Sequence, residues 1–182
     1  LGRSLRAASA DINRDFICFA DMSTNGGKPT GGLYAVADGS LSTKAGEIAS
    51  QTAIETLKRC FNRFYQNEPA GEQGGENILE KCLPQINSDL DRMRSSSMSD
   101  DSFVSSLVCG YFDGNRFHSA HAGNGSVYLV HNARIQRITV NHDIKSLTDP
   151  ALSEEYGAKS ILGFNTANFR AGFASIDVTP GD

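Results

Sequence analysis

The segment from residue 32 to residue 49, GLYAVADGSLSTKAGEIA, constrains the fold of this chain most strongly. An apolar run of strand type ends in the pair Asp38-Gly39, and a helical pattern begins a few residues later. We therefore expect Asp38 at the end of a strand, where its carboxylate can reach a metal ion or a phosphate. The stretch SLST that joins Gly39 to the helix contains no glycine.

Length and charge set the class of protein. The chain has 182 residues, which suits one domain over residues 1–182 with a substantial core. Its formal net charge is −4 and its Lys and Arg residues are not clustered, so nucleic acid is not expected as a partner. No apolar run reaches the roughly 18 residues of a membrane span. The chain starts with Leu1, which indicates a piece of a longer protein.

The four cysteines show no C-x-x-C spacing and lie among apolar residues: Cys18, Cys60, Cys82 and Cys109. This pattern favours buried thiols in a reducing compartment, and hence a cytoplasmic protein. One disulfide pair remains the alternative.

Periodicity and turn residues predict the order of elements. The strands are expected at residues 13–20, 33–37, 104–112, 116–122, 126–130, 135–139 and 173–178. Helices are expected over residues 44–65 and 77–94, with Thr43 as an N-cap, Pro84 kinking or dividing the second helix, and a short third helix near 153–156. The first two strands should form a hairpin and the four strands from 104 to 139 an antiparallel meander. This order predicts an α+β fold with helices packed on an antiparallel sheet.

Several segments in this order resemble the metal-dependent type 2C Ser/Thr protein phosphatases. The pair Asp38-Gly39 followed by AGEIA resembles the start of that family. The further matching segments are NRD at 13–15, SSLV at 105–108, DGN at 113–115, GNGSVYL at 123–129, TVNHD at 139–143, ILG at 161–163 and VTPGD at 178–182. The resemblance implies an α-β-β-α architecture, in which helices flank an antiparallel β-sandwich that here lacks its C-terminal edge.

The resemblance also implies a metal site and a substrate. In the family, two Mn or Mg ions bound by oxygen ligands generate the nucleophile that attacks a phosphoserine or phosphothreonine. Asp38 and the carbonyl of Gly39 match the bridging ligands, and Asp15 matches an acidic position near the metals. A phosphoprotein or another protein is the expected partner.

Other positions depart from the family pattern. Arg14 stands where the family has Glu or Gln, Asn124 where it has a metal-binding aspartate, and Ala10 where it has a phosphate-binding arginine. Two further metal aspartates of the family would lie beyond residue 182. Each lost carboxylate removes up to about 8 kcal/mol of gross attraction to a dication about 4 Å away, so a tight two-metal site is not expected. A single weakly held ion at Asp38 remains an open alternative.

The histidines and serines suggest no other chemistry. His118 and His121 are three residues apart on a strand and should point to opposite faces, so they do not predict a zinc site. Ser126 lacks the G-x-S-x-G frame of a hydrolase nucleophile. His142 is interpreted as a structural hydrogen-bonding group, and residues 94–102 as a candidate contact loop.

Two functions follow from these residues. The first is a pseudophosphatase, a binding or regulatory module without a required metal. The second is an active Mn- or Mg-dependent phosphatase whose remaining ligands lie beyond this chain. Arg14 has two open interpretations: a surface charge, or a cation that replaces the metal by donating to Asp38. No catalytic residue is assigned.

Overall fold

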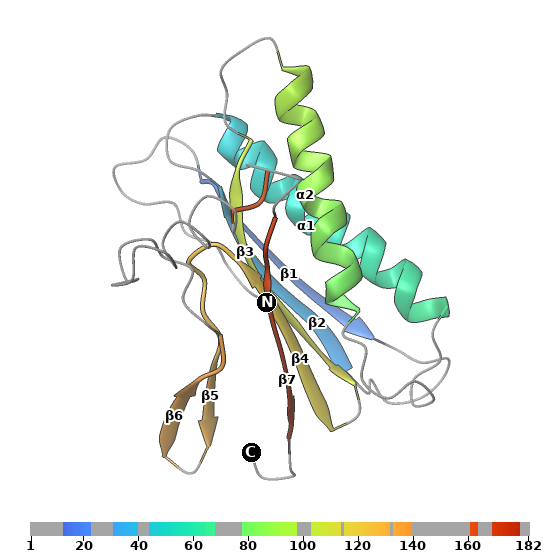
Figure 1. Ribbon diagram of the computed structural model, residues 1–182. Coiled ribbons are helices and arrows are strands. Elements are labelled where there is room, and N and C mark those ends of the chain that lie inside the picture. The colour runs from blue at the N-terminus through green and yellow to red at the C-terminus, as the bar shows by residue number, and fades with distance from the viewer. Residues whose placement is uncertain are drawn as a thin grey trace.

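The computed structural model describes residues 13–22, 31–39, 44–67, 78–97, 103–113, 115–131, 133–139, 161–163 and 169–178. The elements are β1 (Asp15–Met22), β2 (Gly31–Gly39), α1 (Lys44–Asn67), α2 (Leu79–Ser96), β3 (Ser105–Asp113), β4 (Arg116–Ala122), β5 (Tyr128–His131), β6 (Arg134–Arg137) and β7 (Gly172–Asp177). Both helices lie on one side of the larger sheet, and the β5–β6 hairpin lies apart from them (Figure 1). The predicted combination of helices with antiparallel sheet is confirmed.

The larger sheet has five strands in the order β1-β2-β3-β4-β7, and every neighbouring pair is antiparallel. The predicted hairpin of the first two strands is confirmed, with Asp15 opposite Asp38 in the register. Gly39, which follows Asp38 and ends β2, lies opposite Ser105 of β3.

The helices cover only one face of this sheet. Along β2 the side chains of Leu33, Ala35 and Ala37 are buried, whereas those of Tyr34 and Val36 are exposed. This alternation is that of a strand with one covered face. We call the face under the helices the helix face and the opposite face the second face.

The core lies between the helix face and the two helices. Its largest fully buried apolar side chains are Leu33, Leu57, Phe61, Leu79, Leu83, Ile86, Leu90, Leu107, Tyr111 and Leu162. The predicted division of the second helix at Pro84 is wrong, because α2 continues through this residue. Pro84 is exposed, so its ring lies on the solvent side and only one intrahelical hydrogen bond is lost.

The predicted four-strand meander is half correct. β3 and β4 pair as expected, but the other neighbour of β4 is β7, and β5 pairs only with β6 in a separate sheet. The chain leaves the sheet at Gly123, which has φ 84°, and Gly125 then lies on the second face. A Cβ at Gly125 would come within 2.0 Å of Val108 Cγ2, so the absence of a side chain lets the chain cross closely over β3.

All four cysteines are buried and free, as the sequence predicts. Burial raises the pKa of each thiol, and it raises the pKa of Cys82 to about 12. At neutral pH these groups are therefore thiols that pack as small apolar side chains. No helix among the described residues is long and apolar enough to cross a bilayer.

Some predictions fall outside the described residues. Thr43, His142 and the short helix near 153–156 are not described, and neither are residues 98–102 of the candidate contact loop.

Candidate metal site

Asp15 and Asp38 face each other at one end of the larger sheet. The backbone N–H of Gly39 donates to the carbonyl of Arg14 at 3.2 Å, so these two residues form a hydrogen-bonded pair. Asp15 and Asp38, one position away, are therefore a non-hydrogen-bonded pair, the kind in which opposing side chains come closest. By alternation both carboxylates project from the second face.

The pKa of Asp38 reflects how close the two acids lie. Partial burial raises the pKa of the Asp38 carboxyl, and the negative charge of Asp15 and a side-chain hydrogen bond to Asp15 raise it further. The positive charge of Arg14 lowers it by the smallest of the four influences. The site thus disfavours a second negative charge unless a proton or a cation accompanies it.

Two serines hold the backbone at this end of the sheet. The hydroxyl of Ser50, which is fully buried on α1, donates to the carbonyl of Arg14 at 2.5 Å. The hydroxyl of Ser105 donates to the carbonyl of Asp38 at 3.0 Å. Sequence reasoning missed both residues. A polar residue within the apolar stripe of the first helix was a signal that could have revealed Ser50.

Gly39 is required by the packing of the helix against the strand. A Cβ at Gly39 would lie 1.9 Å from the carbonyl oxygen of Gly46 in the first turn of α1. Gly39 is buried and belongs to the helix face, so the start of α1 lies directly behind the candidate site. The glycines of the DG and AGE segments thus meet in space.

The structure also places the two positions that depart from the family pattern. Arg14 precedes Asp15, its backbone carbonyl accepts a hydrogen bond from the N–H of Gly39, and its positive charge lowers the pKa of Asp38. Both interpretations of Arg14, a charge at the strand end and a cation that replaces the metal, therefore stay predictions.

Asn124 is exposed and follows β4 at the same end of the sheet. A Cβ at the preceding Gly123 would come within 2.9 Å of Ser106 Cβ, and Ser106 pairs with Asp38. Asn124 is therefore about two strands, or roughly 10 Å, from Asp38. The structure brings Asp15 and Asp38 together and leaves Asn124 at the edge of the site.

The two histidines of β4 lie on opposite faces, as predicted. His118 is on the helix face, where its ring stacks on Tyr111 at 4.8 Å and its Nδ1 lies 2.7 Å from the hydroxyl of Ser175. His121 is on the second face, where a Cβ at Gly172 would come within 2.0 Å of its ring.

The family follows from a comparison of the sequence. A sequence model of protein phosphatase 2C matches residues 13–156. The chain belongs to the protein phosphatase 2C family. No curated protein matches the chain.

Solved bacterial proteins, two of them named as serine/threonine phosphatases, share the fold of this protein phosphatase 2C domain. The Mycobacterium tuberculosis serine/threonine phosphatase PstP/Ppp matches with TM-score 0.71 and 21% identity over 98% of this chain and 73% of its own. Staphylococcus aureus Stp1 matches with TM-score 0.70 and 20% identity over 94% and 68% of the two chains. Pseudomonas aeruginosa PppA matches with TM-score 0.63 and 22% identity over 93% and 67%. A further PstP structure, with TM-score 0.66 and 20% identity over 97% and 71%, is a complex with two manganese ions.

The oxygen donors at the candidate site meet only part of what a divalent metal ion requires. The two opposed carboxylates are hard oxygen ligands, and a divalent cation between them would offset their repulsion. Among the described residues, however, no group of three or more His, Cys, Asp or Glu side chains could hold a metal. The described donors of this protein phosphatase 2C domain therefore fit one divalent ion that keeps several waters, and they do not by themselves complete a two-ion site.

Proposed function

We propose that this protein phosphatase 2C domain is a pseudophosphatase, which binds a phosphoprotein or another protein partner without hydrolysing it. The observation that carries the proposal is the donor set: two carboxylates, Asp15 and Asp38, meet at the candidate site, and the described residues add no third one. The neutral side-chain amide of Asn124 lies at the same end of the sheet, at the edge of the candidate site.

Electrostatic magnitudes support this proposal. A carboxylate about 4 Å from a dication contributes up to about 8 kcal/mol of gross attraction at an effective dielectric constant of about 20. Two carboxylates can hold one ion weakly after dehydration is subtracted, but a second ion adds cation–cation repulsion that the same two groups cannot offset. One ion, Mn or Mg, would be held by Asp15 and Asp38, with the Gly39 carbonyl as a further candidate ligand. When bound, it would polarise water or a phosphoryl oxygen.

The second candidate function is an active Mn- or Mg-dependent phosphoserine/phosphothreonine phosphatase. The opposed pair Asp15 and Asp38 favours it, because like charges directly opposite on a sheet are destabilising and are retained most readily where a cation binds between them. The remaining ligands would then come from residues outside the described part or outside this chain. The four free cysteines are consistent with the cytoplasm for either function.

A manganese titration distinguishes the two functions. Purified protein is titrated with Mn²⁺ by calorimetry, and phosphate release from a phosphothreonine peptide is followed at each concentration. The pseudophosphatase predicts at most one ion, with weak affinity, and no Mn-dependent phosphate release.

Two variants serve as controls. Asp38→Ala should remove the Mn²⁺ heat, and Asp91→Asn on the surface of α2 should leave it unchanged. Mn-dependent hydrolysis that disappears in Asp38→Ala and persists in Asp91→Asn would establish the active phosphatase and refute the pseudophosphatase.

A further inference from the structure

A buried carboxylate holds two arginines at the surface of the helical layer, along the seam where α1 and α2 pack together. Oδ2 of Asp89 accepts a hydrogen bond from Nη2 of Arg59 on α1, and Oδ1 accepts one from Nη2 of Arg92 on α2, both at 3.0 Å. The hydroxyl of Thr56 and the side-chain amide of Gln85 donate to the same two oxygens at 3.2 and 3.0 Å. Four donors thus fix this carboxylate, and through it both guanidinium groups, across the helix pair.

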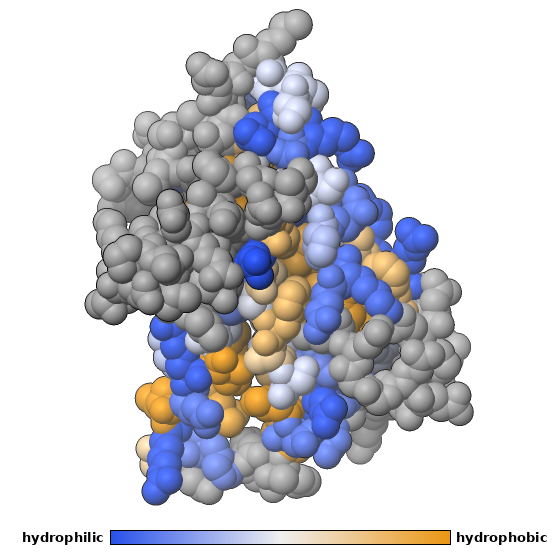
Figure 2. Space-filling model, in the orientation of Figure 1, coloured by the Kyte–Doolittle hydropathy of each residue, from blue (hydrophilic) through white to orange (hydrophobic). Residues whose placement is uncertain are grey.

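The charges of this cluster do not balance. One guanidinium group neutralises the Asp89 carboxylate, and the second leaves a surplus positive charge. The two helices together carry seven Lys and Arg residues and five Asp and Glu residues, whereas the whole chain has a net charge of −4. Figure 2 shows a mainly hydrophilic surface over α2. The helical layer is therefore the positive part of a negative chain, and it should attract anions.

Most donors of the two arginines are available to a ligand. The side chains of Arg59 and Arg92 are 66% and 76% exposed. Each guanidinium group has five N–H groups. Nη2 donates to Asp89 in both arginines and also to Thr56 in Arg59, whereas Nε and Nη1 make no hydrogen bond within the described part of the chain.

A second pair of cations lies further along the same seam. The charged groups of Arg63 on α1 and Lys81 on α2 lie over the ring of Phe64, at 5.9 and 5.7 Å from its centroid. Phe64 follows Thr56 by eight residues on α1. Lys81 precedes Asp89 by eight residues on α2, so about 12 Å of helix separates the two pairs. An extended peptide covers this distance in about four residues.

The geometry of the first pair favours a phosphate group. Arg59 and Arg92 flank the two oxygens of one carboxylate, so their donors are held at a spacing that other adjacent oxygens can bridge. A phosphate monoester has three such oxygens and nearly two negative charges, and guanidinium groups bind it through paired hydrogen bonds. We propose that Arg59 and Arg92 bind the phosphate group of a phosphorylated peptide that carries an acidic residue about four positions away. The choice of a peptide rests on the proposed function, in which the partner is a phosphoprotein.

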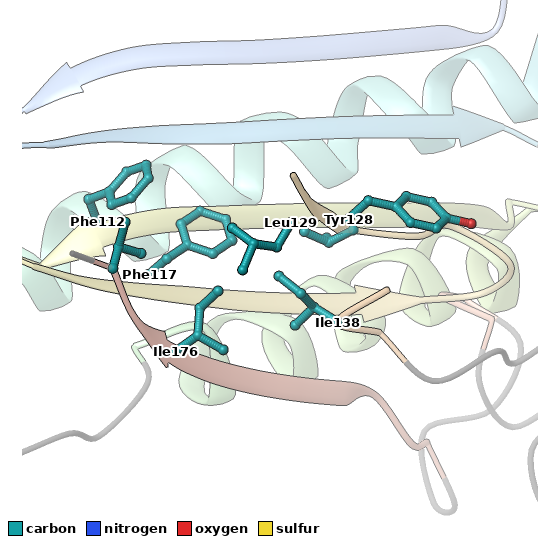
Figure 3. Close-up of a pocket in the computed structure, with 8 residues that line it drawn as sticks. Phe112, Phe117, Tyr128, Leu129, Ile138 and Ile176 are labelled. Carbon is teal, nitrogen blue, oxygen red and sulfur yellow. The ribbon is translucent and has the colours of Figure 1, made fainter. Parts of the chain in front are cut away.

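The second face of the sheet differs from this seam in its chemistry. Between that face and the β5–β6 hairpin, Figure 3 shows uncharged side chains around one space: Phe112, Phe117, Tyr128, Leu129, Ile138 and Ile176. A phosphate group there would lose water without gaining a charged partner. Asp15 and Asp38, at the end of the same face, repel a phosphate group in the absence of a metal ion.

NMR of arginine side chains tests the proposal. Protein with isotope-labelled arginine is titrated, in a chelator, with a glycine peptide that contains one phosphoserine and a glutamate four positions later. The Nε–H signals of Arg59 and Arg92 should shift saturably. Arg116, which is 44% exposed and paired with Asp177 at the edge of the sheet, should not shift. No saturable shift at Arg59 and Arg92, or an equal shift at Arg116, would overturn the proposal.

Variants of the two arginines sharpen the test. Arg92→Ala should weaken peptide binding at least tenfold, and so should Arg59→Ala should the first variant fail to fold. Arg92→Lys keeps the charge on the buried acid but loses the planar fork, so it should weaken binding at least threefold. Arg116→Ala should change binding less than twofold. Unchanged affinity in a folded variant of Arg59 or Arg92 would overturn the proposal.

Matched ligands identify the source of the phosphate. The same peptide with serine in place of phosphoserine, and inorganic phosphate alone, should each bind at least tenfold more weakly than the phosphopeptide. Inorganic phosphate that binds as tightly would indicate an adventitious ion only, and equal binding of the serine peptide would exclude phosphate recognition. Vesicles of phosphatidic acid that shift Arg59 and Arg92 at lower phosphate concentration would assign a membrane instead. Each of these three results overturns the proposal.

One further comparison separates this inference from the proposed function. The chelator removes divalent ions, so peptide binding is measured whether or not the domain hydrolyses phosphate with Mn²⁺. Peptide binding that is lost in Asp38→Ala and retained in Arg92→Ala would place the partner on the second face. This result would overturn the inference and leave the proposed function standing.

Discussion

On β1 and β2 the two faces of the larger sheet carry similar apolar residues in opposite environments. On β2, Leu33, Ala35 and Ala37 are 1%, 5% and 0% exposed under the helices, whereas Tyr34 and Val36 are 41% and 53% exposed on the second face. Phe19 on β1 is 56% exposed on that face. The helix face therefore contributes the packed core, while the second face carries the opposed carboxylates and partly exposed apolar side chains.

The difference has a thermodynamic meaning. Apolar burial stabilises a fold in proportion to the area removed from water, at about 25 cal/mol per Å². Within the described structure, the apolar side chains of the helix face are buried and contribute this free energy. Those of the second face are partly exposed and contribute only part of it. Stability should accordingly respond to substitutions on the helix face, and metal binding to substitutions on the second face.

A pair of phenylalanine substitutions gives the largest expected contrast. Phe61 is fully buried on α1 and packs against Tyr65 at 5.5 Å and Tyr111 at 4.9 Å between ring centroids. Phe61→Ala should cost about 3–5 kcal/mol of unfolding free energy, because it removes apolar contacts and leaves a cavity. Phe19→Ala should cost less than about 1.5 kcal/mol, because half of this ring is already exposed.

Urea denaturation monitored by circular dichroism measures both costs, provided that the slope with urea is unchanged. A Phe19→Ala loss as large as that of Phe61→Ala would mean that something covers the second face in solution. The contrast between the two faces would then not hold.

The second largest effect is expected where strand and helix meet behind the candidate metal site. Gly39→Ala forces a methyl group into the carbonyl oxygen of Gly46, and backbone must move to relieve the clash. Overpacking of this kind costs about 1–3 kcal/mol, and more where backbone cannot shift. At Gly32 a Cβ would come no closer than 3.1 Å, to the hydroxyl at the far end of the Tyr34 side chain, so Gly32→Ala is the matched control.

Thermal unfolding of both alanine variants provides the comparison. Equal melting temperatures for Gly39→Ala and Gly32→Ala would contradict the close approach of α1 to the end of β2.

Only part of this fold could be predicted from the sequence. Short apolar runs, the apolar stripe of the first helix and the Asp38-Gly39 pair predicted β1, β2 and α1. The nearly continuous apolar run of residues 33–37 indicated a strand covered on both faces, whereas Tyr34 and Val36 are exposed. The exit of the hairpin from the sheet was not predicted. It depends on Gly123 with a positive φ and on Gly125 lying over Val108, contacts between residues far apart in sequence.

The candidate site was predicted in composition but not in geometry. The resemblance identified Asp15 and Asp38, yet only the register shows that they are direct cross-strand neighbours. The supporting hydroxyls of Ser50 and Ser105 act through backbone carbonyls, for which a single sequence has no local pattern.

The third prediction concerns a buried acid of the helical layer and one of its ion-pair partners. Asp89 is mostly buried between the helices and accepts hydrogen bonds from Thr56, Arg59, Gln85 and Arg92. Asp89→Asn should lower the unfolding free energy by about 1–3 kcal/mol, because charge-assisted bonds to a buried group are lost. Arg59→Ala should cost less than about 1 kcal/mol, since its side chain is 66% exposed. Urea denaturation at pH 7 checks both values, and a larger loss for Arg59→Ala would contradict this ranking.

The smallest predicted effect is a gain of stability, whereas the earlier variants lower it. It concerns Asp38. Burial and the neighbouring Asp15 raise the pKa of Asp38 in the native state above its ordinary value near 3.8. A carboxyl whose pKa is raised on folding stabilises the native state below its ordinary pKa and loses that contribution as pH rises through the native pKa. At pH 7 the ionised Asp38 thus destabilises the fold, so Asp38→Asn should raise stability by about 0.2–1 kcal/mol, the size of a like-charge cross-strand repulsion.

Measurements at several pH values and salt concentrations test this sign. The gain from Asp38→Asn at pH 7 should shrink as pH falls below 3.8, where the carboxyl is protonated in both states, and it should shrink in high salt, which screens the repulsion. Asp177 is the control, because its hydrogen bond to Arg116 lowers its pKa, so Asp177→Asn should not stabilise the protein at pH 7. Wild-type protein that is more stable than Asp38→Asn at pH 7, in a chelator that removes divalent cations, would contradict the predicted repulsion between the two acids.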